Sequence, residues 1–85
     1  MDIPRKPPMR LFFHMRERGR FSEDDEGGDF DTLDDAHREA IAAAREMMAE
    51  RIRSGRPIDD VAFEIVDEEG ERVLTVPWSD AIVRE

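Results

Sequence analysis

The chain has 85 residues, of which 41% are charged and 39% hydrophobic, and its formal net charge is −9. This length allows a single domain with a small core, because short domains bury a smaller share of their surface than long ones. There is no cysteine, which excludes disulfides, thiolate catalysis and cysteine-ligated metal centres, and fits a reducing compartment. The acidity repels a phosphate backbone, so nucleic-acid binding is disfavoured.

Residues 1–8 contain three prolines and two basic residues and predict a disordered tail, followed by a single domain over residues 9–85. No apolar run approaches the ~20 residues that span a bilayer. The amino terminus also lacks the apolar segment and cleavage site of a signal peptide. We therefore expect a soluble cytoplasmic protein of bacterial type, with no membrane partner.

Residues 9–16 predict a strand, because their side chains alternate with the period of two that strands have. Gly19 allows a tight turn, after which residues 20–23 return as a short second strand. One face of the first strand would carry Leu11, Phe13 and Met15, and the other Phe12, His14 and Arg16.

An acidic segment with paired glycines follows and predicts a loop into a helix, with Phe30 packed beneath the first helical turn. Its acids suggest a calcium site, since hard cations prefer several oxygens from one loop. These acids are Glu23, Asp24, Asp25, Glu26, Asp29 and Asp31. The spacing of an EF-hand is missing, so a solvated acidic loop is the simpler interpretation. We expect no metal and no other cofactor.

Residues 32–55 predict a helix whose apolar side chains form one stripe. Thr32 is a good N-cap, with Asp35 three residues later in a shortened capping box. Gly55 and Pro57 predict where the helix stops. The stripe consists of Leu33, Ala36, Ala40, Ile41, Ala44, Met47, Met48 and Ile52.

The remaining chain predicts a second hairpin. Its strands are residues 61–66 and 72–76, joined by an acidic turn in which Gly70 supplies a positive φ. Pro77 ends the second strand. Residues 78–83 would then form a short turn capped by Ser79, with Trp78 and Ile82 packed on the core.

The predicted order is ββαββ, an α+β fold with one long helix packed on one face of a small, mainly antiparallel sheet. One helix leaves the second sheet face uncovered, and apolar area of this kind favours a protein contact. We therefore expect a homodimer or an unknown protein partner. The possible interaction surface consists of Phe12, His14, Val66, Leu74 and Val76.

Candidate catalytic residues are few. His14 and His37, the latter within the helical stripe, would form a proton-transfer or metal pair if they faced each other. Two separate structural histidines are the simpler interpretation. Ser22, Ser54 and Ser79 lie in no nucleophile context, and no glycine-rich phosphate loop occurs. We predict no catalytic site and no enzyme.

Three segments together resemble a family of short bacterial proteins of unknown function: RLFFHMRERGRFSEDDEGGDF, LDDAHREAIAAAREMMAE and FEIVDEEGERVLTVPW. Members share a YFF-type first strand, a D-x-x-G acidic turn, an alanine-rich helix and a V-x-D-x-x-G hairpin ending in V-P-aromatic. The similarity covers residues 9–82, with Asp24 to Gly27 at the acidic turn and Arg10-Leu11 in place of proline and tyrosine. It implies no assigned activity.

A looser resemblance is to HicB-type antitoxins, in which an acidic, glycine-containing loop leads into a T-L-x-x-A helix. The matching residues are Gly28, Thr32, Leu33, Ala36, Ala40 and Ala44. The DNA-binding module of such regulators is missing from this sequence. Two hypotheses follow: a non-enzymatic protein-interaction or accessory module, or an antitoxin-like regulator that binds a small toxin or nucleic acid.

Overall fold

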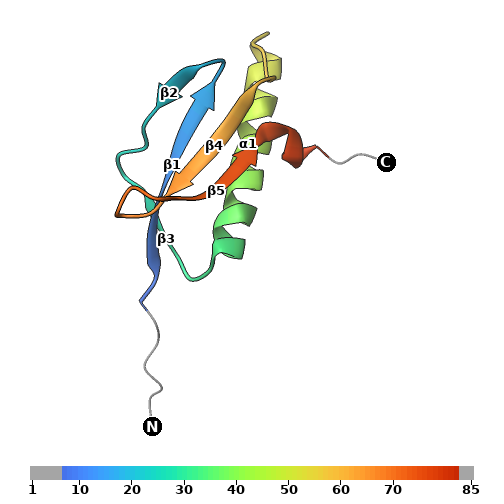
Figure 1. Ribbon diagram of the computed structural model, residues 1–85. Coiled ribbons are helices and arrows are strands. Elements are labelled where there is room, and N and C mark those ends of the chain that lie inside the picture. Colours follow the sequence, from blue (N-terminus) through green and yellow to red (C-terminus); the bar gives the residue numbers. More distant parts are fainter. Residues whose placement is uncertain (1–6, 83–85) are drawn as a thin grey trace.

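The computed structural model of the chain describes residues 7–82. Their elements are β1 (Met9–Glu17), β2 (Arg20–Ser22), β3 (Gly28–Phe30), α1 (Leu33–Arg53), β4 (Val61–Val66), β5 (Arg72–Pro77) and the 3-10 helix η1 (Trp78–Ala81). Helix α1 lies along one face of an antiparallel sheet (Figure 1). The predicted α+β fold is confirmed, with β3 as an additional short strand before the helix. The predicted tail at residues 1–8 falls largely outside the described residues, as does Val83 of the predicted last turn.

The sheet has the strand order β2-β1-β4-β5, and β1 is its longest strand. β4 pairs with one edge of β1, where Phe12 lies opposite Val66. The other edge is shared, because β3 pairs with the beginning of β1 and β2 with its end. A polar loop, residues 23–27, connects β2 to β3 along this edge.

The core lies between α1 and the sheet. Small side chains on the helix allow its backbone to approach the sheet closely, and the larger side chains of the strands fill the remaining space. Ala36, Ala40 and Ala44 are fully buried in this layer. The other buried apolar residues are Leu11, Met48, Val61, Phe63, Ile65, Val76, Trp78 and Ala81.

Both helix ends match the sequence prediction. The Thr32 hydroxyl accepts a 3.0 Å hydrogen bond from the Asp35 N–H, as an N-cap does. At the other end Gly55 has a φ of 71°. The N–H groups of Gly55 and Arg56 donate to the carbonyls of Ile52 and Arg51 at 3.2 and 2.7 Å, which is the Schellman arrangement. These bonds fix where the chain leaves the helix.

The ends of the predicted apolar stripe differ from the structure. Leu33 and Ile52 are 39% and 64% exposed, so they lie outside the core. Arg51 instead is 5% exposed and continues the buried series of Ala44 and Met48. The buried stripe therefore ends with a charged residue at the carboxyl end of α1.

Leu74 and Val76 were predicted on the uncovered sheet face, and this placement is wrong. Val76 lies opposite Phe63 and is fully buried, and Leu74 lies opposite Ile65 on the same side. The cause is a one-residue shift in the β4–β5 register, which leaves Val73 as an extra residue. Because successive strand residues alternate between faces, one extra residue exchanges the two faces.

The chain end after β5 is partly as expected. Trp78 is 1% exposed, and its ring centroid lies 6.1 Å from that of Phe63. The predicted cap at Ser79 is wrong, because η1 follows Pro77 and has no side-chain cap bond. Ile82, predicted on the core, is 50% exposed. Trp78 and the buried Ala81, whose carbonyl accepts from Arg45 Nε at 2.9 Å, therefore anchor this segment.

Candidate functional site

The face of the sheet opposite α1, here called the open face, is formed by the alternate residues of β1 and by their neighbours on the other strands. No helix or strand within residues 7–82 packs over it, and the 23–27 loop lies against its edge at Phe12 and His14. His14 lies opposite Glu64, and Arg16 lies opposite both Ala62 and Phe21. The open face consists of Arg10, Phe12, His14, Arg16, Phe21, Asp29, Ala62, Glu64, Val66, Arg72, Thr75 and Pro77.

An aromatic row crosses the centre of the open face. The His14 ring centroid lies 6.5 Å from that of Phe12, with the rings nearly parallel, and 5.3 Å from that of Phe21. The Arg16 guanidinium stacks 4.9 Å from the Phe21 centroid. Phe21 is 44% exposed. The row therefore offers rigid aromatic area to a partner.

Arginines of the β1 segment surround this row, and each is paired with an acid. Arg10 Nη1 lies 3.0 Å from Asp29 Oδ1, and Arg16 Nε lies 2.6 Å from Glu64 Oε2. Arg18, in the turn after β1, pairs with Asp59. The hydrogen bond from Arg16 lowers the pKa of Glu64 below its ordinary value. The pairs leave the open face close to neutral although the chain is strongly acidic.

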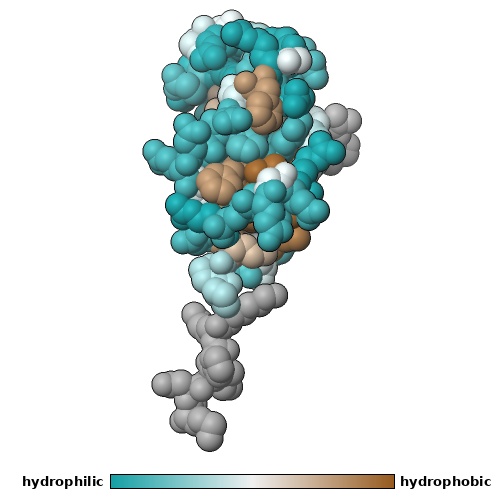
Figure 2. Space-filling view, turned by 60° about the vertical axis from the view of Figure 1, so that its left-hand side comes forward, coloured by the Kyte–Doolittle hydropathy of each residue, from teal (hydrophilic) through white to brown (hydrophobic). Residues whose placement is uncertain are grey.

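The surface on this side of the molecule is mostly hydrophilic. Figure 2 shows its hydrophobic atoms as separate patches enclosed by polar ones. The open face is therefore not the broadly apolar surface that the sequence suggested, since charged residues separate Phe12 and Val66 from Phe21. Its apolar part is the aromatic row with Val66.

Asp24 attaches the 23–27 loop to the edge of β1. Its Oδ2 accepts from the Phe13 N–H at 3.0 Å, and its Oδ1 accepts from the N–H groups of Glu26 and Gly27 at 3.1 and 3.3 Å. Its own N–H donates to His14 Nδ1 at 3.0 Å. Burial raises the pKa of Asp24, but the backbone hydrogen bonds outweigh this and hold the pKa below its ordinary value.

The acidic loop does not assemble a cation site in the part of the chain that the structure describes. Residues 7–82 contain no group of three or more histidines and acids placed to hold a metal ion. Asp24 uses both carboxylate oxygens on backbone N–H groups, and Asp29 is paired with Arg10. Asp24 and Asp29 therefore serve the local fold of the loop.

The two histidines lie in different layers. His14 is on the open face, opposite Glu64, whereas His37 is on α1, which covers the other side of the sheet. The sheet separates them, so they do not form the proton-transfer or metal pair considered from the sequence.

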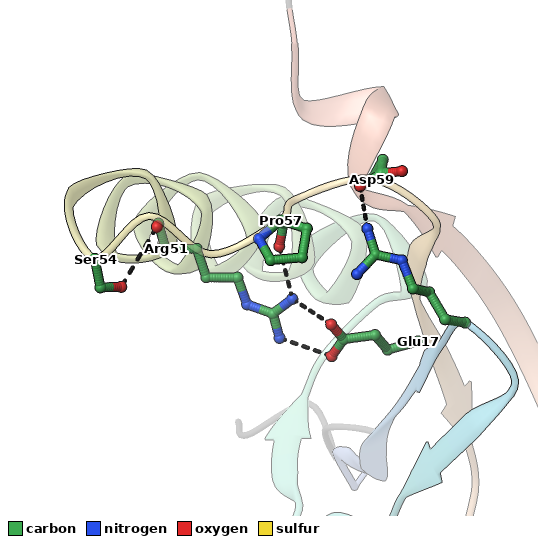
Figure 3. Close-up of polar contacts among 6 residues, drawn as sticks. Glu17, Arg51, Ser54, Pro57 and Asp59 are labelled. Atoms are coloured by element: carbon green, nitrogen blue, oxygen red, sulfur yellow. Dashed lines mark hydrogen bonds and ion pairs between the residues drawn. The ribbon is translucent and has the colours of Figure 1, made fainter.

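Sequence reasoning missed a polar cluster at the carboxyl end of the helix. The Arg51 guanidinium binds both Glu17 oxygens, at 2.7 and 2.9 Å, and donates to the Pro57 carbonyl at 3.2 Å (Figure 3). Its Cζ lies 4.6 Å from the Trp78 ring centroid. Arg51 thus joins α1, the end of β1, the segment after the helix and η1.

This cluster is structural, because Arg51 is enclosed and all its partners belong to the same chain. The hydrogen bond from Arg51 lowers the pKa of Glu17 below its ordinary value. The signal in the sequence was spacing: Arg51 follows Met48 by three residues on the buried stripe. The predicted apolar stripe did not include Arg51, because a charged side chain is rarely buried.

A comparison with known protein families identifies the family of this chain. The model of the family described as "Domain of unknown function (DUF6894)" matches residues 10–79. The chain belongs to this family. The match confirms the resemblance to a family of unknown function, and it includes the whole open face of the DUF6894 chain. No curated protein and no solved structure matches it. Within the described residues of this DUF6894 protein, no helix is long and apolar enough to cross a membrane.

Proposed function

We propose that this DUF6894 protein is a non-enzymatic interaction module of the cytoplasm that acts as a homodimer, with the open faces of two copies packed together. The observation that carries the proposal is the aromatic row of Phe12, His14 and Phe21, which lies on a face that no described element covers. Aromatic residues are enriched in protein interfaces. The absence of cysteine supports the cytoplasmic location.

Charge favours a second copy at this face. Two chains with a formal charge of −9 each repel one another over most of their surfaces. On the open face, by contrast, Arg10 and Arg16 are matched by Asp29 and Glu64. At the centre of this face two copies therefore meet with little repulsion. Acids that form no ion pair within residues 7–82 border the face, in the 23–27 loop and in the turn after β4 beside Arg10. They are Glu23, Asp25, Glu26, Asp67, Glu68, Glu69 and Glu71.

The same pairing argues against the antitoxin-like alternative in its nucleic-acid form. A protein binds nucleic acid by placing arginines and lysines on phosphates, and the binding weakens when those cations are occupied. Arg10 and Arg16 of the open face already hold carboxylates. This charge pattern permits the other form of the antitoxin-like alternative, in which the partner is a small toxin.

The test is a matched pair of variants that add one negative charge each at an exposed hydrophobic residue. Phe21→Glu changes the open face, and Ile52→Glu changes α1 away from it; the two residues are 44% and 64% exposed. We expect the wild type to dimerise at micromolar concentration, Phe21→Glu to weaken the dimer at least about tenfold, and Ile52→Glu to have no effect.

Sedimentation equilibrium measures all three proteins, and circular dichroism checks that each is folded. A wild type that stays monomeric throughout the micromolar range would refute the dimer. Equal weakening by both variants would show that the contact involves another surface.

A further inference from the structure

The gap between β2 and β3 is filled by one residue. β2 pairs with β1 as far as Met15, and β3 pairs with it up to Leu11, which leaves the edge at Phe13 between them. Asp24 occupies this position, with its carboxylate on the Phe13 N–H and its own N–H on His14 Nδ1. The attachment of residues 23–27 to the strand therefore depends on Asp24, on the histidine ring and on Arg10, whose Nη2 donates to the Glu26 carbonyl at 2.8 Å.

The bond to His14 fixes the protonation state of the ring. A backbone N–H can only donate, so the Nδ1 that receives it carries a lone pair. His14 is therefore neutral in this arrangement, with its proton on Nε2. An imidazolium carries hydrogens on both nitrogens and has no acceptor left for Asp24.

We propose that His14 is a proton-operated latch for residues 23–27: the neutral ring holds Asp24 at the edge of β1, and protonation of the ring releases it. Histidine is suited to this role, because its charge changes in the range from about pH 5 to 8. The latch consists of contacts within one chain, so it holds whether or not the protein dimerises.

The charged groups around His14 do not keep the latch closed. Glu64, opposite on β4, is engaged by Arg16, and Arg72 of β5 acts on the same carboxylate. Asp24, on the loop, already uses both oxygens for backbone N–H groups. A new Nδ1–H on His14 either repels the Asp24 N–H and frees the loop or turns to the remaining lone pair of Asp24 Oδ2, and in both cases the Asp24 N–H loses its acceptor. Either response changes how the loop is held.

The close packing of the loop makes the release visible. A Cβ placed on Gly27 would come within 2.9 Å of the Leu11 carbonyl and of the Phe12 ring, so the loop lies directly on β1. On release, the Phe13 N–H loses its acceptor and becomes open to water. Exchange of the Phe13 and Asp24 amide protons with water therefore reports the latch.

The experiment measures this exchange by NMR between about pH 5 and 8, corrected for the intrinsic pH dependence of exchange. In the wild type we expect both amides to become at least about tenfold less protected as His14 becomes charged. The backbone amide of His37, in α1 on the far side of the sheet, serves as the internal reference.

Two variants separate the latch from a general loosening. In His14→Asn the side-chain Oδ1 takes the place of Nδ1 without titrating, so protection should persist at every pH. In His14→Phe the acceptor is lost and a ring is kept, so both amides should be exposed at every pH.

Protection in the wild type that does not follow the His14 titration would overturn the proposal, and so would normal protection in His14→Phe. Measurements at concentrations below and above the dimer midpoint distinguish the two proposals. A pH effect that persists in the monomer supports the latch even if the dimer proposal fails.

Discussion

Arg51 is a buried cation, and groups from several parts of the domain pair with its charge and accept its hydrogen bonds. Burying a charge is favourable only when it is paired and its hydrogen bonds are satisfied. Glu17 supplies the charge, Pro57 accepts a further bond, and Trp78 covers the guanidinium. A lysine would keep the charge but could not bind both carboxylate oxygens in the same plane.

Removal of Arg51 should be costly. Arg51→Ala leaves Glu17 without its partner and opens space beneath Trp78, so we expect a loss of about 3 kcal/mol in the free energy of unfolding. Arg53 is the matched control, since its side chain is 71% exposed and pairs only with Glu50. Arg53→Ala should cost less than about 0.5 kcal/mol. Urea denaturation measures both, and equal losses would contradict the assignment of Arg51 as the structural cation.

Acid should weaken the fold through Glu17. Because Arg51 lowers the pKa of Glu17 in the folded state, the unfolded chain binds the proton more readily. The stabilisation is complete above the ordinary value of 4.5 and is lost as the pH falls through the lowered value. We expect the urea concentration at the midpoint of unfolding of the wild type to decrease as the pH is lowered below about 4.5. The Glu17→Gln variant should be less stable than the wild type at neutral pH, and its urea midpoint should decrease less steeply with falling pH. A decrease as steep as that of the wild type would exclude the Glu17–Arg51 pair as a cause of the acid sensitivity.

At the level of the elements, the extra residue in β5 decides which side chains reach the core. Without the shift at Val73, Val76 would lie on the open face and Thr75 on the helix side. With it, Val76 is fully buried opposite Phe63, and Thr75 is exposed opposite Glu64. Substitutions at the adjacent residues Thr75 and Val76 therefore test the β4–β5 register directly.

Polar substitution at these two positions should have very different effects. Val76→Asn places an amide in the core, and we expect it to cost about 3 kcal/mol or more. Thr75→Asn changes an exposed side chain and should cost less than about 1 kcal/mol. Thermal unfolding followed by circular dichroism compares them, and the reverse order of stability would mean that the bulge is absent.

The helix was predictable because its signals are local. Thr32 caps it and Gly55 ends it through contacts within a few residues, and the sequence contains all of them. β3 was missed because three residues that include a glycine carry no strand pattern. It forms because β2 pairs with β1 only as far as Met15, which leaves the beginning of the same edge of β1 unpaired.

The uncovered face was only partly predictable for the same reason. Alternation along β1 correctly put Phe12 and His14 on one side. The arginine pairs and the His14–Asp24 bond join residues distant in sequence, and only the strand register brings them together. The misplacement of Leu74 and Val76 came from a register shift that alternation within a single strand does not reveal.

For the whole molecule, the formal charge of −9 sets how the dimer should respond to salt. Arg10 and Arg16 on the open face are already paired within each chain, so the main electrostatic effect between copies is repulsion. Salt screens it. We expect the dimer to tighten as ionic strength rises from about 0.05 to 0.5 M. Weakening over the same range, measured by sedimentation equilibrium, would show instead that ion pairs between the copies hold it together.

The central position of β1 also has a consequence for synthesis. β1 pairs with β4 across the entire length of the helix in sequence, and a hairpin alone is only marginally stable in water. The first hairpin and α1 therefore have no stable partner until β4 is available, and the loop between β1 and β4 must close first. A nascent chain would remain unfolded until Val66 has left the ribosome, so this domain folds as a unit once β4 has emerged.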